Sequence, residues 1–430
     1  MPKKLSCKYL QNDKDGHLYC AFTVGDNEGL STCRSFIDVP RIETLLPKEE
    51  KEEQKSYLDA IREKVREEHA TLALGAGISI PAGLPGWCGL ISRLFGYALQ
   101  FSRYSLEEGI ESKKQIQKSR VESALIKGGL TMFEGGNVLE AGQYVIQMLE
   151  SALGYKIGEE MLKEPISAII HEGRRAYDLN GAKRCKIDRT KISQAKKDSL
   201  RAVAYLLQAK NGFRRAITYN YDTLVEECLI DLFKIDPRRI ISHPGGWSTI
   251  LHEEKIEDQI DIFHVHGCVL RREYQGIDKY ARLRESKRII LSEDSYYNAE
   301  QQETYNWMNS IQSYYLNRDT CVFVGFSADD YNFRRILRQM GKGDQIHKDK
   351  PKHYLILTVD DLVKDIWHNV CRSYLSEKDK GTIDTAEICA QVRFLLYEQL
   401  KAKRKYWKRY NFFPIWVTVP DIPKTLLSII

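Results

Sequence analysis

Residues 71–79 of the 430-residue chain read Thr71-Leu72-Ala73-Leu74-Gly75-Ala76-Gly77-Ile78-Ser79. The first four residues have the pattern of a short buried strand. The run Gly75-Ala76-Gly77 then lets the backbone turn sharply and brings amide groups close to a ligand phosphate at the start of a helix. This motif is weak alone, because ordinary tight turns use the same glycines. The third glycine of the dehydrogenase fingerprint is replaced by Ile80, and no acidic residue follows at the required distance on a second strand. Hydride-transfer chemistry is therefore disfavoured.

After residue 210 the chain alternates between short apolar strands and helix-like segments. The predicted strands are residues 216–219, 262–265, 289–291, 321–324, 353–358 and 412–418. Helix-like segments with polar caps follow several of them, beginning at Asp222, Ser292 and Asp329. Apolar strands that alternate with helices are typical of a mainly parallel sheet covered on both faces. The sequence thus predicts an α/β fold, a Rossmann-like doubly wound sheet.

The rest of the chain is predicted to form additions to this sheet. Residues 1–46 alternate in short stretches broken by Asp and Gly turns, and are predicted to form an N-terminal β accessory segment. Residues 47–430 are assigned to the main domain, with a helix at 49–69 and a large helical insertion at about 88–210. Inside the insertion, residues 171–199 hold nine Lys or Arg against four Asp or Glu, which favours a mobile loop or exposed arm.

Composition disfavours several classes of protein. No apolar run reaches the roughly 18–20 residues needed to cross a bilayer, so no membrane association is expected. The first residues lack the apolar stretch of a secretory signal, and the ten cysteines form no CxxC pair. A zinc ribbon or disulfide scaffold is therefore disfavoured, and a reducing, cytoplasmic location is expected. The net charge of +6 is too small to predict direct nucleic-acid binding. Residues 401–410 hold six basic and no acidic side chains, which favours a solvated helix face over contact with phosphate or an acidic partner.

Four predicted strand ends carry polar or glycine residues suited to ligand binding. In an open parallel sheet, ligands bind beyond the carboxyl ends of the strands, where the strand order reverses. All four ends are therefore expected to open on one side of the sheet. The residues concerned are Gly75, Gly77 and Ser79, then Asn220 and Asp222, then His266, and finally Gly325 and Ser327.

The polar residues of the second and third ends have alternative interpretations. Asn220 can form a hydrogen bond with a ribose hydroxyl, and Asp222 can form one with a carboxamide. In a purely structural interpretation, Asp222 caps the next helix and Asn220 forms hydrogen bonds with polar groups of the turn. His266 is either a structural hydrogen-bonding residue or a general base near neutral pH. His264 alternates with His266 and is expected to share its face, but no third ligand stands at zinc-site spacing.

In their order and approximate spacing, these elements resemble the sirtuin family. The resemblance is closest to the sirtuin-like NAD-hydrolysing effectors of bacterial anti-phage defence, including those of Thoeris type, and it covers about residues 66–93 and 210–360. Any single motif is weak, whereas the ordered set is fairly specific. The motifs that carry it are Gly75-Ala76-Gly77-Ile78-Ser79, Asn220-Tyr221-Asp222, His266-Gly267 and Gly325-Phe326-Ser327.

The resemblance implies a role for each matching residue. Asn220 is expected to face the nicotinamide ribose and position the attacking water, and His266 is expected to be the catalytic histidine. Asp222 is expected to bind the carboxamide. The pyrophosphate side of NAD is assigned to Gly75, Ala76, Gly77 and Ser79, the adenosine half to Gly325 and Ser327, and the loop over the nicotinamide pocket to Leu84, Pro85, Gly86 and Trp87.

Departures from the family pattern bear on the reaction. Sirtuin deacylases carry paired CxxC motifs for a structural zinc, which this chain lacks, so no zinc is expected. Residues 81–87 replace their Asp-Phe-Arg run. Both losses affect regions that support acyl-lysine peptides, so an NAD glycohydrolase that uses NAD as its substrate is favoured. The alternatives are a non-catalytic NAD- or nucleotide-sensing subunit and, less favoured, an NAD-dependent deacylase. Family habit implies a homo-oligomer or work beside a separate sensor or ATPase, for which a HerA-like helicase is one candidate. Because the chain has no GxxxxGK[ST] loop, such an ATPase is expected to be another chain.

Overall fold

A seven-stranded sheet forms the centre of the fold, with the strand order β11-β10-β9-β5-β6-β8-β7. The computed structural model describes residues 46–107, 138–156, 159–172, 197–243, 257–271, 277–281, 283, 286, 289–292, 303–327, 330–340, 350–359, 362 and 385–430, and four short strands within residues 10–32. Every pairing in the large sheet is parallel. The strands are β5 (Ala70–Leu74), β6 (Arg215–Thr218), β7 (Ile240–His243), β8 (Ile260–His264), β9 (Thr320–Val324), β10 (His353–Thr358) and β11 (Phe412–Val417). The predicted α/β, doubly wound fold is confirmed.

The strand order reverses at β5. The chain passes from β5 to β6 on one side, and it later returns to pair β9 with the other side of β5. Leu74, the last residue of β5, lies opposite both Thr218 of β6 and Val324 of β9. In doubly wound sheets this reversal opens a crevice beyond the carboxyl ends of the strands. The glycines at 75, 77 and 325 follow β5 and β9 directly at this point.

Two apolar layers cover the sheet. In β5, Leu72 and Leu74 contribute to one core and Ala73 to the other, as expected from the alternation of side chains along a strand. The first core includes residues of α8 (Ser199–Gln208), α9 (Leu224–Glu227) and α16 (Ile422–Leu427), and the second includes residues of α12 (Glu303–Arg318) and α13 (Tyr331–Met340). Helices on both faces bury the sheet, which explains why its strands are continuous apolar runs.

Most of the predicted strands match the observed ones, but two assignments differ. Residues 289–291 were expected to form a strand and do not. The Ile290 N–H donates to the His266 carbonyl and the Tyr221 hydroxyl donates to the Ile290 carbonyl, so this buried segment bonds to loops rather than to a neighbouring strand. In addition, β7 was not predicted. Its four residues follow the short 3₁₀ turn Pro237–Arg239 and form the edge of the sheet.

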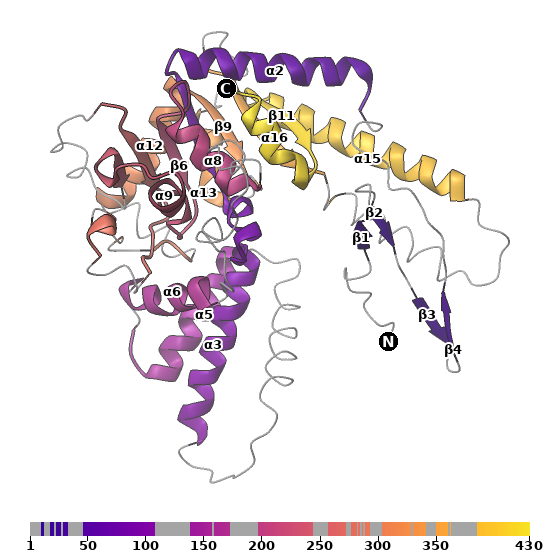
Figure 1. The fold of residues 1–430 in the computed structure, drawn as a ribbon. Coiled ribbons are helices and arrows are strands. Elements are labelled where there is room, and N and C mark those ends of the chain that lie inside the picture. Colours follow the sequence, from indigo (N-terminus) through magenta and orange to yellow (C-terminus); the bar gives the residue numbers. More distant parts are fainter. Residues whose placement is uncertain are drawn as a thin grey trace, which may run out of the picture.

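The described part of residues 88–210 is helical. The helices are α3 (Trp87–Glu107), α5 (Val138–Leu153), α6 (Lys163–Glu172) and α8, with the 3₁₀ turn Glu159–Leu162. Figure 1 shows α3, α5 and α6 grouped on one side of the sheet. The predicted basic arm at 171–199 falls mostly on residues 173–196, which lie outside the described residues, as does the helix predicted after Ser292.

Residues before 46 contain two antiparallel hairpins. One pairs β1 (Leu10–Asn12) with β2 (Leu18–Cys20), and the other pairs β3 (Thr23–Asp26) with β4 (Gly29–Thr32). Their alternating sequence therefore does form strands. The division of the chain into an accessory segment and a main domain stays a prediction.

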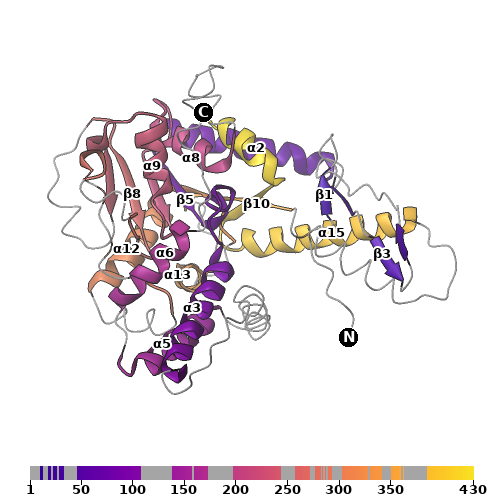
Figure 2. The ribbon, with the colours of Figure 1, turned by 60° about the horizontal axis from the view of Figure 1, so that its bottom comes forward.

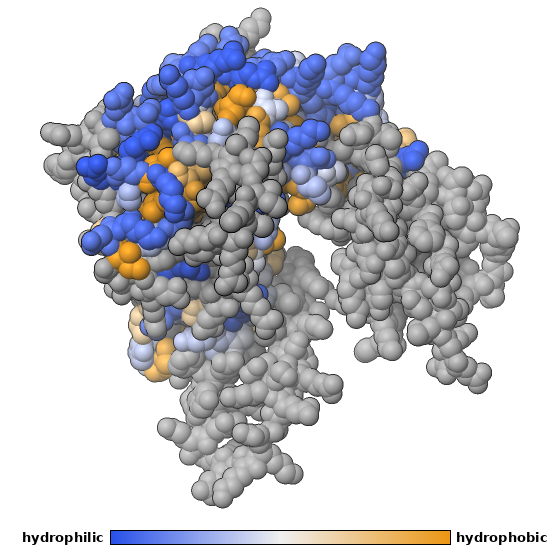
Figure 3. Space-filling view, viewed as in Figure 1, coloured by the Kyte–Doolittle hydropathy of each residue, from blue (hydrophilic) through white to orange (hydrophobic). Residues whose placement is uncertain are grey.

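The basic stretch 401–410 lies at the end of α15 (Thr385–Lys408) and meets α2 (Lys48–Arg66). Arg404 pairs with Glu50 at 2.7 Å and with Glu53 at 3.3 Å, and Lys408 pairs with Glu53 at 2.8 Å. Figures 1 and 2 show both helices running outward from the sheet in the same direction. The opposite face of α2 is hydrophilic in Figure 3. Part of the basic stretch thus meets an acidic patch within the same chain.

None of the helices in the described ranges has the length and apolar character to cross a membrane.

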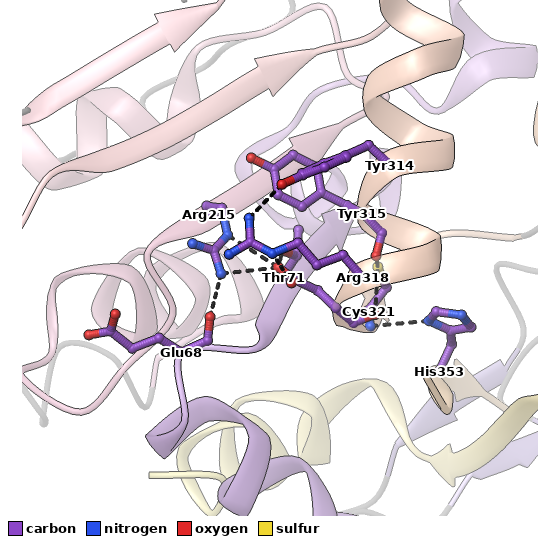
Figure 4. A network of polar contacts seen from close by, with 9 residues as sticks. Glu68, Thr71, Arg215, Tyr314, Tyr315, Arg318, Cys321 and His353 are labelled. Carbon is purple, nitrogen blue, oxygen red and sulfur yellow. Dashed lines mark hydrogen bonds and ion pairs between the residues drawn. The ribbon is translucent and has the colours of Figure 1, made fainter. Parts of the chain in front are cut away.

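A buried ion pair joins three strands at the amino-terminal edge of the sheet. Asp319 precedes β9 and is fully buried, and its Oδ2 atom accepts from Thr71 Oγ1 at 2.7 Å and from Arg215 Nε at 3.2 Å. Arg215 also donates to the Glu68 carbonyl, and its guanidinium lies 5.7 Å from the centre of the Tyr315 ring (Figure 4). This network holds β5, β6 and β9 together at the end opposite the crevice.

Replacement of Asp319 is expected to destabilise the fold strongly. The variant Asp319→Asn leaves the Arg215 guanidinium without its charged partner at a largely buried site, and removal of one partner of such a pair costs about 3 kcal/mol or more. The measurement is the free energy of unfolding in urea. Asp59→Asn is the matched control, because Asp59 is 59% exposed in its pair with Arg62 and is expected to contribute less than about 1 kcal/mol. Equal losses in the two variants would contradict this account.

Candidate functional site

Two glycine turns contact each other backbone to backbone at the strand reversal. The Gly75 N–H donates to the Val324 carbonyl at 3.0 Å, and the Gly77 N–H donates to the Gly325 carbonyl at 2.8 Å. A Cβ atom at Gly75 would lie 2.4 Å from the Gly325 oxygen. Gly325 has a φ of +64°, and a Cβ atom there would lie 2.5 Å from the Ile78 nitrogen. Only glycine fits these positions, so the close approach of the two loops explains both residues.

Four amides of this loop, those of Gly75, Gly77, Ile78 and Ser79, have partners within the protein. The Ile78 N–H donates to the Gly75 carbonyl and the Ser79 N–H donates to the Ala76 carbonyl, which forms the single 3₁₀ turn Ala76–Ile78. The amides of Gly75 and Gly77 bond to the β9 loop, as described above. The observed role of the two glycines is thus close packing of loops. The assignment of residues 75–79 to a pyrophosphate stays a prediction.

Asn220 connects the end of β6 to the end of β5. Its Nδ2 atom donates to the Gly75 carbonyl and to Ser79 Oγ, both at 3.2 Å, and its own N–H donates to Thr218 Oγ1. The residue is only 7% exposed. Its Oδ1 atom is buried and has no hydrogen-bond partner among the described residues. A buried amide oxygen is costly without a partner, so this atom is suited to accept a hydrogen bond from a ligand or water.

Asp222 lies beside the same serine. Its Oδ1 atom accepts from the N–H of Leu224, the first residue of α9, at 3.1 Å, although the N-cap residue of this helix is Thr223. Burial, with smaller contributions from the nearby Glu227 and Glu226 carboxylates, raises the pKa of Asp222 to about 6, although hydrogen bonds from Leu224 and Ser79 oppose this effect. Ser79 therefore bonds to both Asn220 and Asp222. Four of the predicted site residues, namely Gly75, Ser79, Asn220 and Asp222, meet in one cluster.

His266 has a different set of contacts. Its Nε2 atom lies 3.5 Å from Asp330 Oδ2, and its ring meets the Tyr219 ring edge-on at 5.3 Å. Burial lowers the pKa of His266, although the Asp330 charge and a hydrogen bond with the Tyr219 main chain oppose this effect. Asp330 also caps α13 by accepting from the Phe333 N–H at 2.7 Å. Tyr219 precedes Asn220, so the chain at the end of β6 connects the His266 contacts to the Asn220 cluster.

The expectation that His264 and His266 share one face is wrong. His264 Nε2 lies 2.8 Å from Glu226 Oε1 on α9, which belongs to one apolar layer, whereas His266 meets the start of α13, which belongs to the other. The reason is that β8 ends at His264 and the chain turns immediately, with Gly267 at a φ of +87°. In the parts of the chain that the structure describes, no three His, Cys, Asp or Glu side chains gather as metal ligands would.

The remaining predicted residues lie at the rim of the cluster. Trp87 begins α3, and its ring lies 5.7 Å from the ring of Tyr221, which stands between Asn220 and Asp222. Ala76 is half-buried within the first glycine turn. Ser327 is exposed two residues beyond Gly325. The structure thus places Trp87 near the Asn220 cluster and Ser327 on the side of β9.

Sequence reasoning missed two acidic residues that hold the site histidines. Asp330 follows the helix start that was expected at Asp329, and its contact with His266 was not foreseen. Glu226 is 1% exposed and Glu227 is fully buried, although both are acidic. The available signal was their position inside the apolar run Leu224-Val225-Glu226-Glu227-Cys228-Leu229-Ile230, because a buried carboxylate requires partners.

Comparison with known proteins bears on the same region. No curated protein matches the chain. Residues 214–379 match a family model described as the SIR2-like domain. The matched interval runs from the start of β6 past β10, and it includes Asn220, Asp222, His266 and Gly325 but not the turn that follows β5. This part of the chain is therefore similar to a SIR2-like domain, which indicates an NAD-related function.

Proposed function

We propose that this chain is an NAD glycohydrolase that cleaves the bond between nicotinamide and ribose. The observation that supports the proposal is the hydrogen bonding of the Asn220 side-chain amide at the strand reversal. Its Nδ2 atom is fixed by Gly75 and Ser79, whereas its buried Oδ1 atom has no partner among the described residues. An amide held in this way presents an oriented acceptor to a ribose hydroxyl or to a water molecule, and such orientation is a large part of catalysis.

In this proposal the reaction is a substitution at the anomeric carbon of the ribose. The bond to nicotinamide breaks with its electron pair on nicotinamide, and the sugar passes through an oxocarbenium-like state. Water then adds at the same carbon and loses a proton, which gives an ADP-ribose product. Asn220 orients the ribose hydroxyls or the water. The Asp222 carboxylate accepts a hydrogen bond from the carboxamide of nicotinamide.

His266 is proposed as the proton acceptor of this reaction. Burial lowers its pKa, so the imidazole is neutral near pH 7 and has a nitrogen able to take a proton. The dinucleotide is proposed to lie along the two glycine turns, with residues Gly75, Ala76, Gly77 and Ser79 on the pyrophosphate side. Gly325 and Ser327 are proposed to contact the adenosine half, and Trp87 to cover the nicotinamide.

The biological setting is part of the same proposal. The ordered set of motifs supports an effector that depletes NAD in the cytoplasm during anti-phage defence, in the manner of abortive infection. Uncontrolled NAD cleavage would harm the host, which supports control through a homo-oligomer or through a separate sensor or ATPase subunit. Residues 1–46 and the helical insertion are proposed as the surfaces for such control.

Loss of the Asn220 amide is expected to abolish most turnover. Asn220→Ala removes the oriented acceptor, and His266→Ala removes the proton acceptor. Each change is expected to lower nicotinamide release about 10²–10⁴-fold. The measurement is nicotinamide formed from NAD by purified protein, alone and with the products of neighbouring genes, with thermal unfolding as the check on folding.

Asn317→Ala is the matched control for this experiment. Asn317 is an exposed residue of α12 whose Nδ2 atom donates to the Ser313 carbonyl of its own helix, and its replacement is expected to leave nicotinamide release unchanged. Nicotinamide release near the wild-type rate by both site variants would refute the proposal. Tight NAD binding by the wild-type protein without turnover would instead support a sensing subunit.

Asp222 is expected to set the acidic limit of activity. Its pKa is about 6, so the carboxylate that accepts from the carboxamide predominates above this pH and is lost as the pH falls below it. The value of kcat/KM for nicotinamide release is therefore expected to fall below pH 6. Asp222→Asn keeps an oxygen acceptor that does not titrate, so this variant is expected to lose the part of the decline that Asp222 causes and to keep the part that protonation of His266 causes.

The control for the pH profile is Asp236→Asn. Hydrogen bonds from the side chain and main chain of Arg238 lower the pKa of the exposed Asp236 to about 2, so this carboxyl does not titrate in the relevant range. Its variant is expected to keep the wild-type profile. An unchanged acidic decline in Asp222→Asn would show that another group causes it.

A further inference from the structure

His264 is a fully buried histidine that the proposed reaction does not use. Its two ring nitrogens contact two different groups. Nε2 lies 2.8 Å from Glu226 Oε1, and Nδ1 lies 3.4 Å from the main-chain carbonyl of Asn220. Glu226 in turn accepts from Ser242 Oγ at 3.1 Å, so its carboxyl is fixed on two sides by β7 and β8.

If Nδ1 of His264 donates to the Asn220 carbonyl, the chemistry of the two partners determines the protonation of the imidazole. A carbonyl oxygen can only accept, so the hydrogen bond to Asn220 requires a proton on Nδ1. A carboxylate also only accepts, so Nε2 must then carry a proton as well. The imidazole then donates from both nitrogens, to the Glu226 carboxylate and to the Asn220 carbonyl.

We propose that His264, held by Glu226, is a positioning residue that fixes the main chain of Asn220 and thereby aims its side-chain amide at the reacting sugar. This inference rests on the proposed function of Asn220. The side chain of Asn220 bonds to the β5 turn, and its carbonyl bonds to His264 of β8. The residue is thus held from the strands on both sides of β6.

The surrounding charges favour the protonated imidazole. Burial lowers the pKa of His264, but the charge and hydrogen bond of Glu226, the Asn220 carbonyl and the charge of Asp222 together raise it above the ordinary value. Glu227 follows on α9 and lies close enough to Asp222 to affect its pKa. His266 forms an equivalent bond to the main chain of Tyr219 from the other apolar layer. Two histidines therefore restrain consecutive residues at the end of β6.

Two isosteric substitutions separate positioning from simple stability. In His264→Asn, the amide nitrogen occupies the place of Nδ1 and can still donate to the Asn220 carbonyl, but the contact with Glu226 is lost. In His264→Gln, the amide nitrogen occupies the place of Nε2, so the Glu226 contact is kept and the Asn220 contact is lost. His69→Gln, at an exposed histidine, serves as the control for the substitution itself.

The positioning role predicts that activity follows the Asn220 contact rather than stability. His264→Gln is expected to lower kcat for nicotinamide release about 10²-fold with little change in KM, because displacement of a catalytic group by about 1 Å has effects of this size. His264→Asn is expected to lose markedly less kcat even if its unfolding temperature is the lower of the two. The inference would be overturned if the variant with the lower unfolding temperature also had the lower kcat, or if His264→Asn lost more kcat than His264→Gln.

Crystal structures of the two variants test the inference independently of turnover. If wild-type protein releases no nicotinamide under any condition, the proposed function fails, but the position of Asn220 can still be compared. His264→Asn is expected to keep the contacts of Asn220 Nδ2 with Gly75 and Ser79, and His264→Gln is expected to lose them. An unmoved Asn220 amide in His264→Gln would overturn the positioning role whatever the reaction is.

Discussion

The candidate site depends on the contact between the turns after β5 and β9. Gly75 and Gly77 meet Gly325 so closely that a Cβ atom at Gly75 or Gly325 would lie within about 2.5 Å of backbone atoms. Bulkier residues would force the two loops apart at the strand reversal. The Gly75 carbonyl accepts from Asn220, so a displaced turn would also move the Asn220 amide. Backbone packing of two loops thus determines the position of a side chain on a third.

From this contact, hydrogen bonds continue through polar groups that are almost entirely buried. Asn220 bonds to Ser79, Ser79 bonds to Asp222, and the Asn220 carbonyl meets His264 with its partner Glu226. Buried polar groups are costly unless each has a partner, so such a network restricts its members to few arrangements. Burial acts on all of their acid–base groups, but the charged partners differ. Burial lowers the pKa of His266 despite the Asp330 charge, and it raises the pKa of Asp222, whereas Glu226 and other partners raise the pKa of His264 against burial.

The fold could be predicted because buried parallel strands are continuous apolar runs, as in β9 and β10. The strand assigned to 289–291 was wrong because an apolar run records burial, and a buried loop satisfies the same pattern. The grouping of Asn220 with Asp222 and Ser79 followed from the rule that carboxyl ends of parallel strands meet at one edge. The opposite orientations of His264 and His266 could not be predicted, because alternation holds only while the strand continues and β8 ends between them. The bonding of the Gly75 and Gly77 amides to β9 also depends on a long-range contact that no local motif encodes.

The polar network at the amino-terminal edge of the sheet holds strands together, whereas the polar cluster at the carboxyl edge forms the candidate site. At the amino-terminal edge, the Asp319 Oδ2 atom accepts from Thr71 and Arg215 and so links three strands, while its Oδ1 atom has no hydrogen-bond partner among the described residues. At the carboxyl edge, the Asn220 Oδ1 atom has no hydrogen-bond partner among the described residues, and burial raises the pKa of Asp222. Unfavourable burial of this kind persists only where the surrounding structure holds it in place. Tyr219 and Asn220 are restrained from both apolar layers, so a substrate that reaches both Asn220 and His266 must lie across the end of β6. In the proposed reaction, this placement would put the ribose between the Asn220 amide and the His266 imidazole.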